Sequence, residues 1–189
     1  MKNPSFTIYT GPMFGSKTTR LLGDIDRLKY KGDKVLIVKP KIDQRYSDGE
    51  IVSHNGGKVS AICVESADEI IDHINNLNVY SVIAVDEAFM IKDIDKVLID
   101  YYKSGLSIII SSIQLDAKEI PFESIKNMMP FATKIEICPA VCTMCDQDAY
   151  YTAALFDMEN TTQEERLGSN DKYEPRCFKH YPEFKVIDD

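Results

Sequence analysis

The sequence predicts an α/β fold in which a parallel sheet is flanked by helices. Two observations carry this prediction: short, almost continuously apolar runs recur along the chain, and segments with the apolar spacing of amphipathic helices lie between them. Because such runs are typical of strands buried on both faces, we expect the strands to be parallel. Alternation of strand and helix is characteristic of doubly wound sheets. The expected strands are residues 6–9, 35–38, 82–85 and 107–113.

The first expected helix, residues 18–31, directly follows the first strand. One side of it is apolar, with these residues at helical spacing: Leu21, Leu22, Ile25 and Leu28. Gly32, between a lysine and an aspartate, provides the signal that ends it. Three more helices are expected further along the chain: 67–76, 91–102 and a shorter one, 120–129.

Composition limits the class of protein. The chain has 189 residues, of which 44% are hydrophobic, which suits one full core with a small appendage. Its formal net charge of −8 makes nucleic acid or an anionic membrane a poor partner. No apolar stretch approaches the ~18 residues of a membrane span, and the N-terminus has no apolar core of a signal peptide. We therefore expect a cytoplasmic protein.

Residues 11–18, Gly-Pro-Met-Phe-Gly-Ser-Lys-Thr, nearly match the phosphate-binding loop Gly-x-x-x-x-Gly-Lys-Ser/Thr. Such a loop cradles phosphates with backbone N–H groups at the positive end of the following helix. Lys17 would add a cation, and the Thr18 hydroxyl would complete a Mg²⁺ shell. Ser16 stands where the pattern has glycine, and Gly15 lies one place earlier. An ordinary glycine-rich turn would explain the glycines but not the adjacent Lys17 and Thr18.

The strand at 82–85 ends in two acids, Asp86 and Glu87. In phosphate-loop enzymes we expect this strand beside the first one, with Asp86 holding Mg²⁺ directly or through water. Glu87 would then act as general base or orient the attacking hydroxyl. Side chains alternate along a strand, so the two carboxylates can have different roles. The alternative is a charged strand-to-helix turn, since acids also favour a helix N-terminus.

The C-terminal part carries two pairs of potential metal ligands, each with a two-residue spacer: Cys142 with Cys145, and Cys177 with His180. Three thiolates and one imidazole suit tetrahedral Zn²⁺, and a site with four protein ligands is structural. The alternative is two accidental spacings of buried cysteines. Because the composition changes near Cys138, we expect a nucleotide-binding α/β domain over 1–138 and a zinc-binding domain over 139–189.

Together these motifs resemble the type II thymidine kinases, the cellular and viral family with a zinc-bound C-terminal lasso. The resembling segments follow one another in the family's order: Gly-Pro-Met-Phe at 11–14, Asp-Gln-Arg-Tyr-Ser at 43–47, Asp-Glu-Ala at 86–88, Ala-Val-Cys-x-x-Cys at 140–145, Ala-Tyr-Tyr-Thr at 149–152, and Leu-Gly then Asp-Lys-Tyr within 167–173. The resemblance implies a P-loop, RecA-like sheet with a small zinc-bound lasso domain that closes over the nucleoside. The chain's divergence would suit a viral or phage member.

The resemblance also implies a reaction, transfer of the γ-phosphoryl group of ATP to the 5′-hydroxyl of thymidine to give dTMP. Glu87 would be the general base, and Arg45 would approach the reacting phosphate. The implied nucleotide-binding residues are Gly11, Pro12, Met13, Phe14, Gly15, Ser16, Lys17, Thr18 and Asp86, of which Thr18 and Asp86 would hold Mg²⁺. The implied nucleoside-binding residues are Met13, Asp43, Arg45, Glu87, Phe122, Thr152, Gly168 and Tyr173.

Within that set, the resemblance implies that Met13 and Thr152 line a pocket for the thymine methyl group. Gly168 and Tyr173 would belong to the lasso. Plainer interpretations stay open, with Met13 filling the core, Tyr173 packing beside the zinc and Arg45 being a solvated loop charge. Members of the family are usually tetramers, so a homotetramer is expected, with ATP and a nucleoside as small-molecule partners.

The chain departs from the family pattern mainly on the nucleoside side. Gln114 takes the place of an aspartate, and Ala117 that of an aromatic residue bordering the nucleoside. Because differential contacts set substrate choice, a kinase for another pyrimidine or a modified deoxynucleoside is an alternative. Ser16 motivates a second alternative, a nucleotide-binding regulatory protein without turnover. A zinc-ribbon nucleic-acid binder is disfavoured by the acidic charge.

Overall fold

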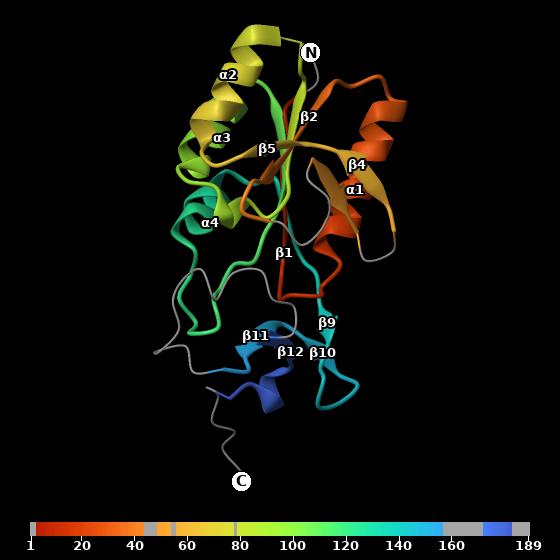
Figure 1. Cartoon of the computed structure of the whole chain (residues 1–189), viewed down its shortest axis with the longest axis vertical. Coiled ribbons are helices and arrows are strands. Elements are labelled where there is room, and N and C mark those ends of the chain that lie inside the picture. The colour runs from red at the N-terminus through yellow and green to blue at the C-terminus, as the bar shows by residue number, and fades with distance from the viewer. Residues whose placement is uncertain (1–2, 44–48, 54–55, 78, 157–171, 183–189) are drawn as a thin grey trace.

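The computed structural model describes residues 3–43, 49–53, 56–77, 79–156 and 172–182. Its centre is a six-stranded sheet in the order β5-β2-β6-β7-β1-β8, with every neighbouring pair parallel (Figure 1). The strands have these bounds: β1 Phe6–Thr10, β2 Val35–Pro40, β5 Ile62–Val64, β6 Val82–Val85, β7 Ser107–Ser111 and β8 Lys134–Ile137. The predicted α/β class and parallel sheet are therefore confirmed.

Sequence patterns missed the two edge strands. β5 has only three residues, and β8 reads Lys-Ile-Glu-Ile with both isoleucines exposed, so neither has the continuous apolar run of a buried strand. One expectation of order was wrong: β6 does not lie beside β1, because β7 pairs with both. The run Ile108, Ile109 and Ile110 suits that place, since a strand there is buried on both faces.

Helices cover both faces of the sheet (Figure 1). Their bounds are α1 Lys17–Tyr30, α2 Ala67–Leu77, α3 Ile94–Lys103 and α4 Glu123–Met128, with short 3₁₀ turns η1 Ala88–Met90 and η2 Met129–Phe131. The helix predicted at 91–102 begins at Ile94, because the chain first makes η1 and an Asp93 in left-handed conformation precedes the helix. The helix predicted at 120–129 is shorter at both ends.

Two apolar cores lie on the two faces. The larger one joins the sheet to α2, α3 and α4 and includes Phe6, Ile83 and Leu98, which are fully buried. The smaller one lies under α1, where Leu21 and Ile25 pack against the other face of the sheet. These helical residues are among the four predicted to face the sheet, and Leu22 and Leu28 belong to the same cluster.

Smaller strands complete the fold. A hairpin of β3 (Glu50–Val52) and β4 (Lys58–Ser60) lies on the α1 side of the sheet (Figure 1). Two two-stranded sheets follow β8, formed by β9 (Ala140–Val141) with β10 (Asp148–Ala149), and by β11 (Tyr151–Ala154) with β12 (Tyr173–Arg176). The short turn η4 (Phe178–His180) follows β12.

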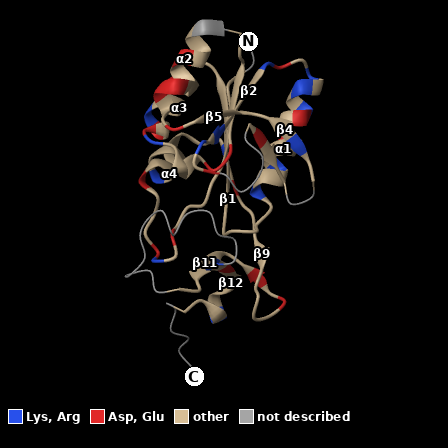
Figure 2. Ribbon diagram, viewed as in Figure 1, with Lys and Arg blue, Asp and Glu red and all other residues tan. Residues whose placement is uncertain are grey.

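Charged residues are distributed along the helices and loops, with both signs interspersed (Figure 2). No helix in the described part of the chain is long and apolar enough to cross a membrane. The carboxyl ends of the parallel strands meet at one edge of the sheet, where ligands of such folds bind. The smaller strands β9 to β12 lie beyond this edge in Figure 1.

Candidate active site

The phosphate loop joins the end of β1 to the start of α1, and its two glycines are required by a close approach. A Cβ atom at either Gly11 or Gly15 would collide with the carbonyl oxygen of Cys138, which directly follows β8. Gly11 also has φ 132°, a conformation that residues with a side chain rarely adopt. The loop is therefore pressed against the end of β8, and this contact explains why the second glycine stands at position 15.

Ser16 has a left-handed backbone, with φ 57° and ψ 24°, immediately before α1. This is the position where the phosphate-loop pattern has glycine, and the structure shows why: a Cβ in the left-handed region costs about 1–2 kcal/mol. The serine side chain is exposed, so no burial compensates locally. With serine in place of glycine at position 16, the loop thus keeps its conformation, but the backbone of Ser16 is strained.

The first residues of α1 lie beside the acid at the end of β6. The Thr18 hydroxyl donates to the carboxylate of Asp86, with distances of 3.1 Å to Oδ1 and 3.3 Å to Oδ2. Ser111, at the end of β7, donates its hydroxyl to the same carboxylate. Lys17 is buried, and its Nζ donates to the Pro12 carbonyl at 2.5 Å. Ser111 was missed by the sequence patterns, although a serine closing an isoleucine run was a usable signal.

Glu87 follows Asp86 but has left the strand, since β6 ends at Val85. Its backbone is left-handed, with φ 48° and ψ 46°. The strand alternation expected to separate the two carboxylates therefore does not extend to them, and a left-handed turn follows Asp86 instead. A glutamate held in such a conformation stores strain, and residues of this kind cluster at active sites. The side chain is half-buried.

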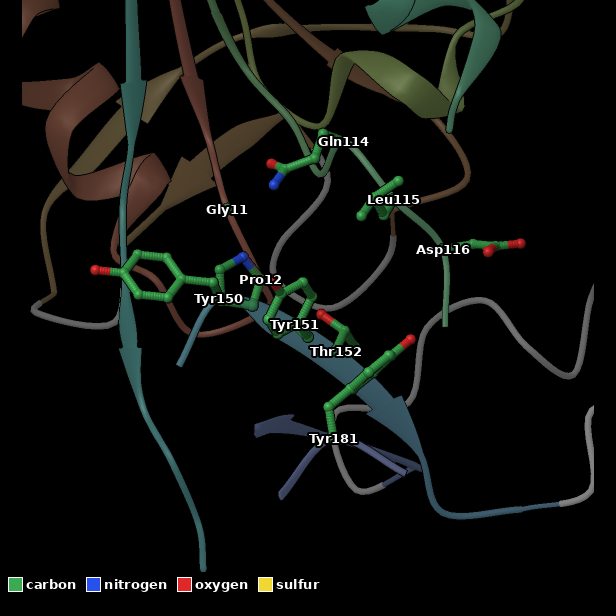
Figure 3. A pocket seen from close by; sticks show the side chains of 9 residues that line it. All are labelled: Gly11, Pro12, Gln114, Leu115, Asp116, Tyr150, Tyr151, Thr152 and Tyr181. Atoms are coloured by element: carbon green, nitrogen blue, oxygen red, sulfur yellow. The ribbon is translucent and has the colours of Figure 1, made fainter. Parts of the chain in front are cut away.

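A shallow pocket, open to solvent, lies between the phosphate loop and the C-terminal strands (Figure 3). Its lining residues are Gly11, Pro12, Gln114, Leu115, Asp116, Tyr150, Tyr151, Thr152 and Tyr181. The rings of Tyr151 and Tyr181 lie 5.0 Å apart, and the Tyr181 hydroxyl donates to the Ala117 carbonyl at 3.2 Å. The pocket therefore combines aromatic faces with a few polar groups, as small-molecule sites do.

Thr152 joins the two parts of the chain at this pocket. Its hydroxyl oxygen accepts a hydrogen bond from the backbone N–H of Met13 at 3.1 Å. Gln114 lies on the opposite wall, where its Oε1 accepts from the Thr10 hydroxyl (Figure 3). The structure thus brings the Met13 backbone and the Thr152 side chain together; Thr152 lines the pocket, whereas Met13 is not among its lining residues. Tyr151 belongs to the segment 149–152 that carries part of the resemblance, but no role was expected for it, and no sequence pattern indicated Tyr181.

The remaining predicted residues are distributed around this region. Phe122 is half-buried and packs against Phe89, with ring centroids 4.5 Å apart. Asp43 is buried just beyond β2. Tyr173 begins β12 and contacts the ring of Phe156 at 5.4 Å. The other two predicted residues, Arg45 and Gly168, lie outside the described residues.

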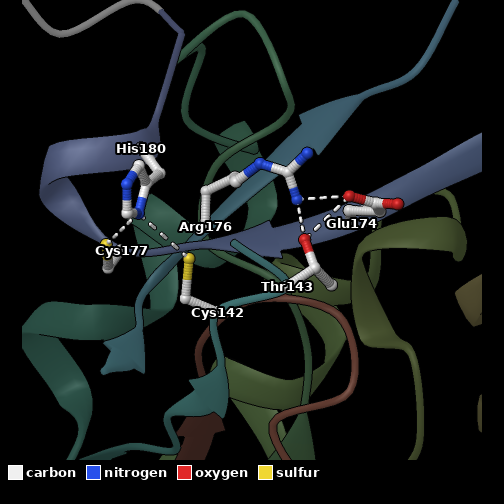
Figure 4. A network of polar contacts seen from close by, with 6 residues as sticks. All are labelled: Cys142, Thr143, Glu174, Arg176, Cys177 and His180. Carbon is white, nitrogen blue, oxygen red and sulfur yellow. Dashed lines mark hydrogen bonds and ion pairs between the residues drawn. The ribbon is translucent and has the colours of Figure 1, made fainter. Parts of the chain in front are cut away.

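The four predicted metal ligands converge. The ligand atoms of Cys142, Cys145, Cys177 and His180 all lie within 4.8 Å of one another. His180 Nδ1 lies 3.7 Å from Cys142 Sγ and 3.3 Å from Cys177 Sγ, as Figure 4 shows. Cys145 Sγ lies 3.7 Å from Cys177 Sγ. Tetrahedral Zn–S bonds of about 2.3 Å place sulfur atoms about 3.8 Å apart, so the donor set and spacing fit zinc.

The environment of the cluster shifts the pKa values of two of its thiols in opposite directions. Burial raises the pKa of the Cys142 thiol, but hydrogen bonds from the backbone N–H groups of Cys177 and Met144, together with those of the His180 and Cys177 side chains, outweigh it and lower that pKa to about 6. A backbone hydrogen bond from Gln147 lowers the pKa of the Cys145 thiol, but burial and the neighbouring sulfur atoms of Cys177 and Cys142 outweigh it and raise that pKa. The thiolate is the form that binds metal. Beside the cluster, Arg176 donates to both Thr143 and Glu174, and Thr143 donates to Glu174 at 2.7 Å (Figure 4). This network joins the first ligand pair to β12.

Comparison with known proteins gives one consistent result. The family model described as thymidine kinase matches residues 4–181. The thymidine kinase of Thermococcus kodakarensis is 32% identical over 181 residues, which cover 92% of each chain. The thymidine kinase of Mesomycoplasma hyopneumoniae is 35% identical over 171 residues, covering 90% of this chain and 91% of the relative.

Replacing Ser16 by glycine should stabilise the protein. We expect S16G to raise the free energy of unfolding by about 0.5–1 kcal/mol, because relief of left-handed strain exceeds the entropy that glycine adds to the unfolded chain. Urea denaturation measures the change. Ser16→Ala keeps the Cβ and the strain, so it should bring no such gain; equal effects of both variants would contradict the strain argument.

Metal analysis tests the cysteine and histidine cluster. Freshly purified protein should contain about one zinc ion per chain. Cys145→Ser should lose that zinc and unfold at a lower temperature, since it removes one of four ligands. Cys63→Ser is the matched control, because Cys63 is half-buried in β5 and outside the cluster. Zinc-free wild-type protein, or full zinc content in the Cys145 variant, would overturn the assignment.

Proposed function

Since the chain belongs to the thymidine kinase family, whose activity is the ATP-dependent phosphorylation of thymidine to dTMP, we propose that the phosphate loop and the two acids after β6 form its active site. The observation that carries this proposal is the contact between Thr18 and Asp86. It places a hydroxyl of the loop helix and a buried carboxylate in position to share one cation, as phosphoryl-transfer enzymes require.

The loop would hold the phosphates of ATP. Its backbone N–H groups and the N-terminus of α1 provide a positive end for them, and Lys17 adds an ammonium group. Thr18 and Asp86 would hold Mg²⁺, while the Ser111 hydroxyl donates to Oδ1 of the same carboxylate and fixes its orientation. When bound, Mg²⁺ would neutralise negative charge that develops during transfer.

Glu87 would act as the general base. In the transfer, the 5′-oxygen of the nucleoside forms a bond to the γ-phosphorus, the bond from that phosphorus to the bridging oxygen breaks, and ADP leaves. The proton of the 5′-hydroxyl passes to the Glu87 carboxylate. The left-handed turn at Glu87 supports this role, because it separates the base from Asp86, which serves the metal.

The nucleoside base would enter the pocket between the loop and β11. Aromatic faces from Tyr151 and Tyr181 suit a flat pyrimidine, and Met13 with Thr152 would border its methyl group. Further contacts to the nucleoside are proposed for residues around this region: Asp43, Arg45, Phe122, Gly168 and Tyr173. Of these, the roles of Arg45 and Gly168 rest on the sequence resemblance alone.

The C-terminal part would close the site with zinc as a structural ion. We assign residues 1–138 to the nucleotide-binding domain and 139–189 to the zinc-binding lasso domain, since the metal ligands and the pocket residues from β11 to Tyr181 all follow Cys138. A cytoplasmic homotetramer that acts on small molecules remains the expectation from the family resemblance.

Gln114 and Ala117 favour a second candidate within the same reaction, phosphorylation of a modified pyrimidine deoxynucleoside. Gln114 places an amide on the pocket wall, and its Oε1 is held by Thr10. At Ala117 the backbone carbonyl accepts from the hydroxyl of Tyr181, an aromatic residue of the C-terminal part that lines the pocket. Groups that contact the nucleoside set its discrimination from competitors, so differences at these positions would change the preferred nucleoside.

A nucleoside panel tests the function. With Mg²⁺ and ATP, we expect phosphorylation of thymidine in preference to the purine deoxynucleosides, whose bases are larger. We also expect it in preference to deoxycytidine, because Met13 and Thr152 would border a methyl group that cytosine lacks. Formation of the 5′-monophosphate is measured directly. Strong turnover of a 5-substituted deoxyuridine, with no turnover of thymidine, would favour the second candidate. ATP binding without turnover of any nucleoside would indicate a regulatory relative and refute the kinase assignment.

Replacing Glu87 by glutamine tests the base. E87Q should lower turnover by about 10²- to 10⁴-fold while ATP affinity stays nearly unchanged, because only the proton acceptor is lost. Glu119→Gln is the matched control, since Glu119 is also a glutamate with a positive φ, of 63°, but lies in an exposed turn. It should retain full turnover. Unchanged turnover in E87Q would refute the role of Glu87.

A further inference from the structure

A second buried lysine lies at the carboxyl edge of the sheet. Lys39, the penultimate residue of β2, is only 3% exposed. Its Nζ donates to the backbone carbonyl of Glu50 at 3.3 Å, and among the residues that the structure describes this is the hydrogen bond found for the ammonium group. Sequence patterns did not single it out, because a lysine near the end of an apolar strand resembles a solvated strand end.

The burial of this ammonium group has a physical consequence. A lysine ammonium has three N–H donors, and one long hydrogen bond to a neutral carbonyl satisfies only one of them. Buried charges are costly unless they are paired and hydrogen-bonded. A buried cation with spare donors at the ligand-binding edge of a parallel sheet therefore indicates an anionic ligand.

The register of the sheet places Lys39 beside the magnesium-binding acid. Val38 of β2 is paired with Val85 of β6, so the next residues, Lys39 and Asp86, lie level on neighbouring strands. Ile37 belongs to the core under α1, and side chains two apart on a strand share a face. Lys39 is therefore on the α1 face of the sheet, the face on which Thr18 of α1 meets Asp86.

The strand order then decides which phosphate Lys39 can meet. From the phosphate loop after β1, the order across the sheet is β7, β6 and β2. Lys39 thus lies beyond Asp86 and Glu87 from the loop. In phosphate loops the backbone N–H groups cradle the α- and β-phosphates of ATP, and the loop lysine reaches the β- and γ-phosphates. The terminal phosphate extends from the loop toward the acceptor and its base.

We propose that Lys39 is a second phosphate-binding cation, whose Nζ donates to an oxygen of the terminal phosphate of ATP as that group passes to the nucleoside. The proposal rests on the function proposed above. Lys39 and Lys17 would then bind the transferred group from opposite sides of Asp86. Positive charge placed where negative charge concentrates in the transition state accelerates phosphoryl transfer.

A purely structural role is the competing explanation, because the bond to Glu50 also anchors the β3–β4 hairpin. The two roles differ in what they predict for ligands. If Lys39 only anchors the hairpin, its loss lowers the stability of the protein and weakens ATP and ADP binding alike. If Lys39 binds the terminal phosphate, its loss weakens ATP binding and leaves ADP binding unchanged. Lys58 offers a matched control, since it contacts the Glu50 carboxylate at 3.6 Å from the exposed surface of the same hairpin.

The experiment compares binding of ATP and ADP, each with Mg²⁺, to the full-length protein by calorimetry. Lys39→Met should weaken ATP binding by about 10- to 100-fold, the effect of one charge-assisted hydrogen bond, and leave ADP binding unchanged. Thymidine turnover should fall by a similar or larger factor. Lys58→Met should change neither. Lys39→Gln keeps a donor for the Glu50 carbonyl and should show the same loss for ATP.

If Lys39→Met weakens ATP binding and ADP binding equally, the proposal is overturned in favour of the structural role. It is also overturned if Lys39→Met binds ATP as tightly as the wild type does. If Lys39→Met does not fold, Lys39→Gln decides by the same two measurements. Failure of the kinase assignment is seen separately, as absence of turnover in the wild type, and leaves the binding comparison valid.

Discussion

The position of the phosphate loop depends on one contact, the approach of the Cys138 carbonyl to Gly11 and Gly15. The N–H of Cys138 donates to the Thr10 carbonyl at 2.7 Å, which continues the pairing of β8 with β1 by one residue. The carbonyl of the same residue then occupies the space beside Gly11 and Gly15 where any Cβ would stand. The position of the loop over the sheet is therefore fixed by the backbone of β8, and the side chain of Cys138 only fills the core under α1.

Strain in this fold is concentrated where the phosphates and the acceptor would meet. Five residues other than glycine have positive φ in the described part of the chain, namely Phe14, Ser16, Glu87, Asp93 and Glu119. Phe14 and Ser16 belong to the phosphate loop, and Glu87 is the proposed base. Each left-handed residue costs on the order of 1 kcal/mol, so the cores on both sheet faces must stabilise these turns. A loop and a base held in this way are preorganised before substrate binds, which is how such sites gain rate.

Sequence patterns predicted the parts of the fold that follow from continuous burial and from local motifs. The central strands were found because strands such as β7 are apolar on both faces, and the metal ligands because two short spacings determine which residues meet. The order of the strands was not predictable from the sequence, because nothing in the apolar pattern shows whether β6 or β7 lies beside β1. For that reason Ser111 and Lys39, whose meaning depends on which strand lies next to Asp86, emerged only from the pairing.

The zinc cluster and the phosphate loop are distant in sequence but share the pocket. Tyr181 directly follows the metal ligand His180, and its hydroxyl donates to Ala117 in the segment after β7. Thr152, on the strand paired with β12, accepts from the N–H of Met13 in the loop. Because the ligands at Cys177 and His180 fix where the chain leaves β12, they also fix the aromatic wall that Tyr181 contributes. A metal ion held by these ligands would therefore shape the pocket through Tyr181, whose hydroxyl reaches the Ala117 carbonyl, without contacting any reacting atom.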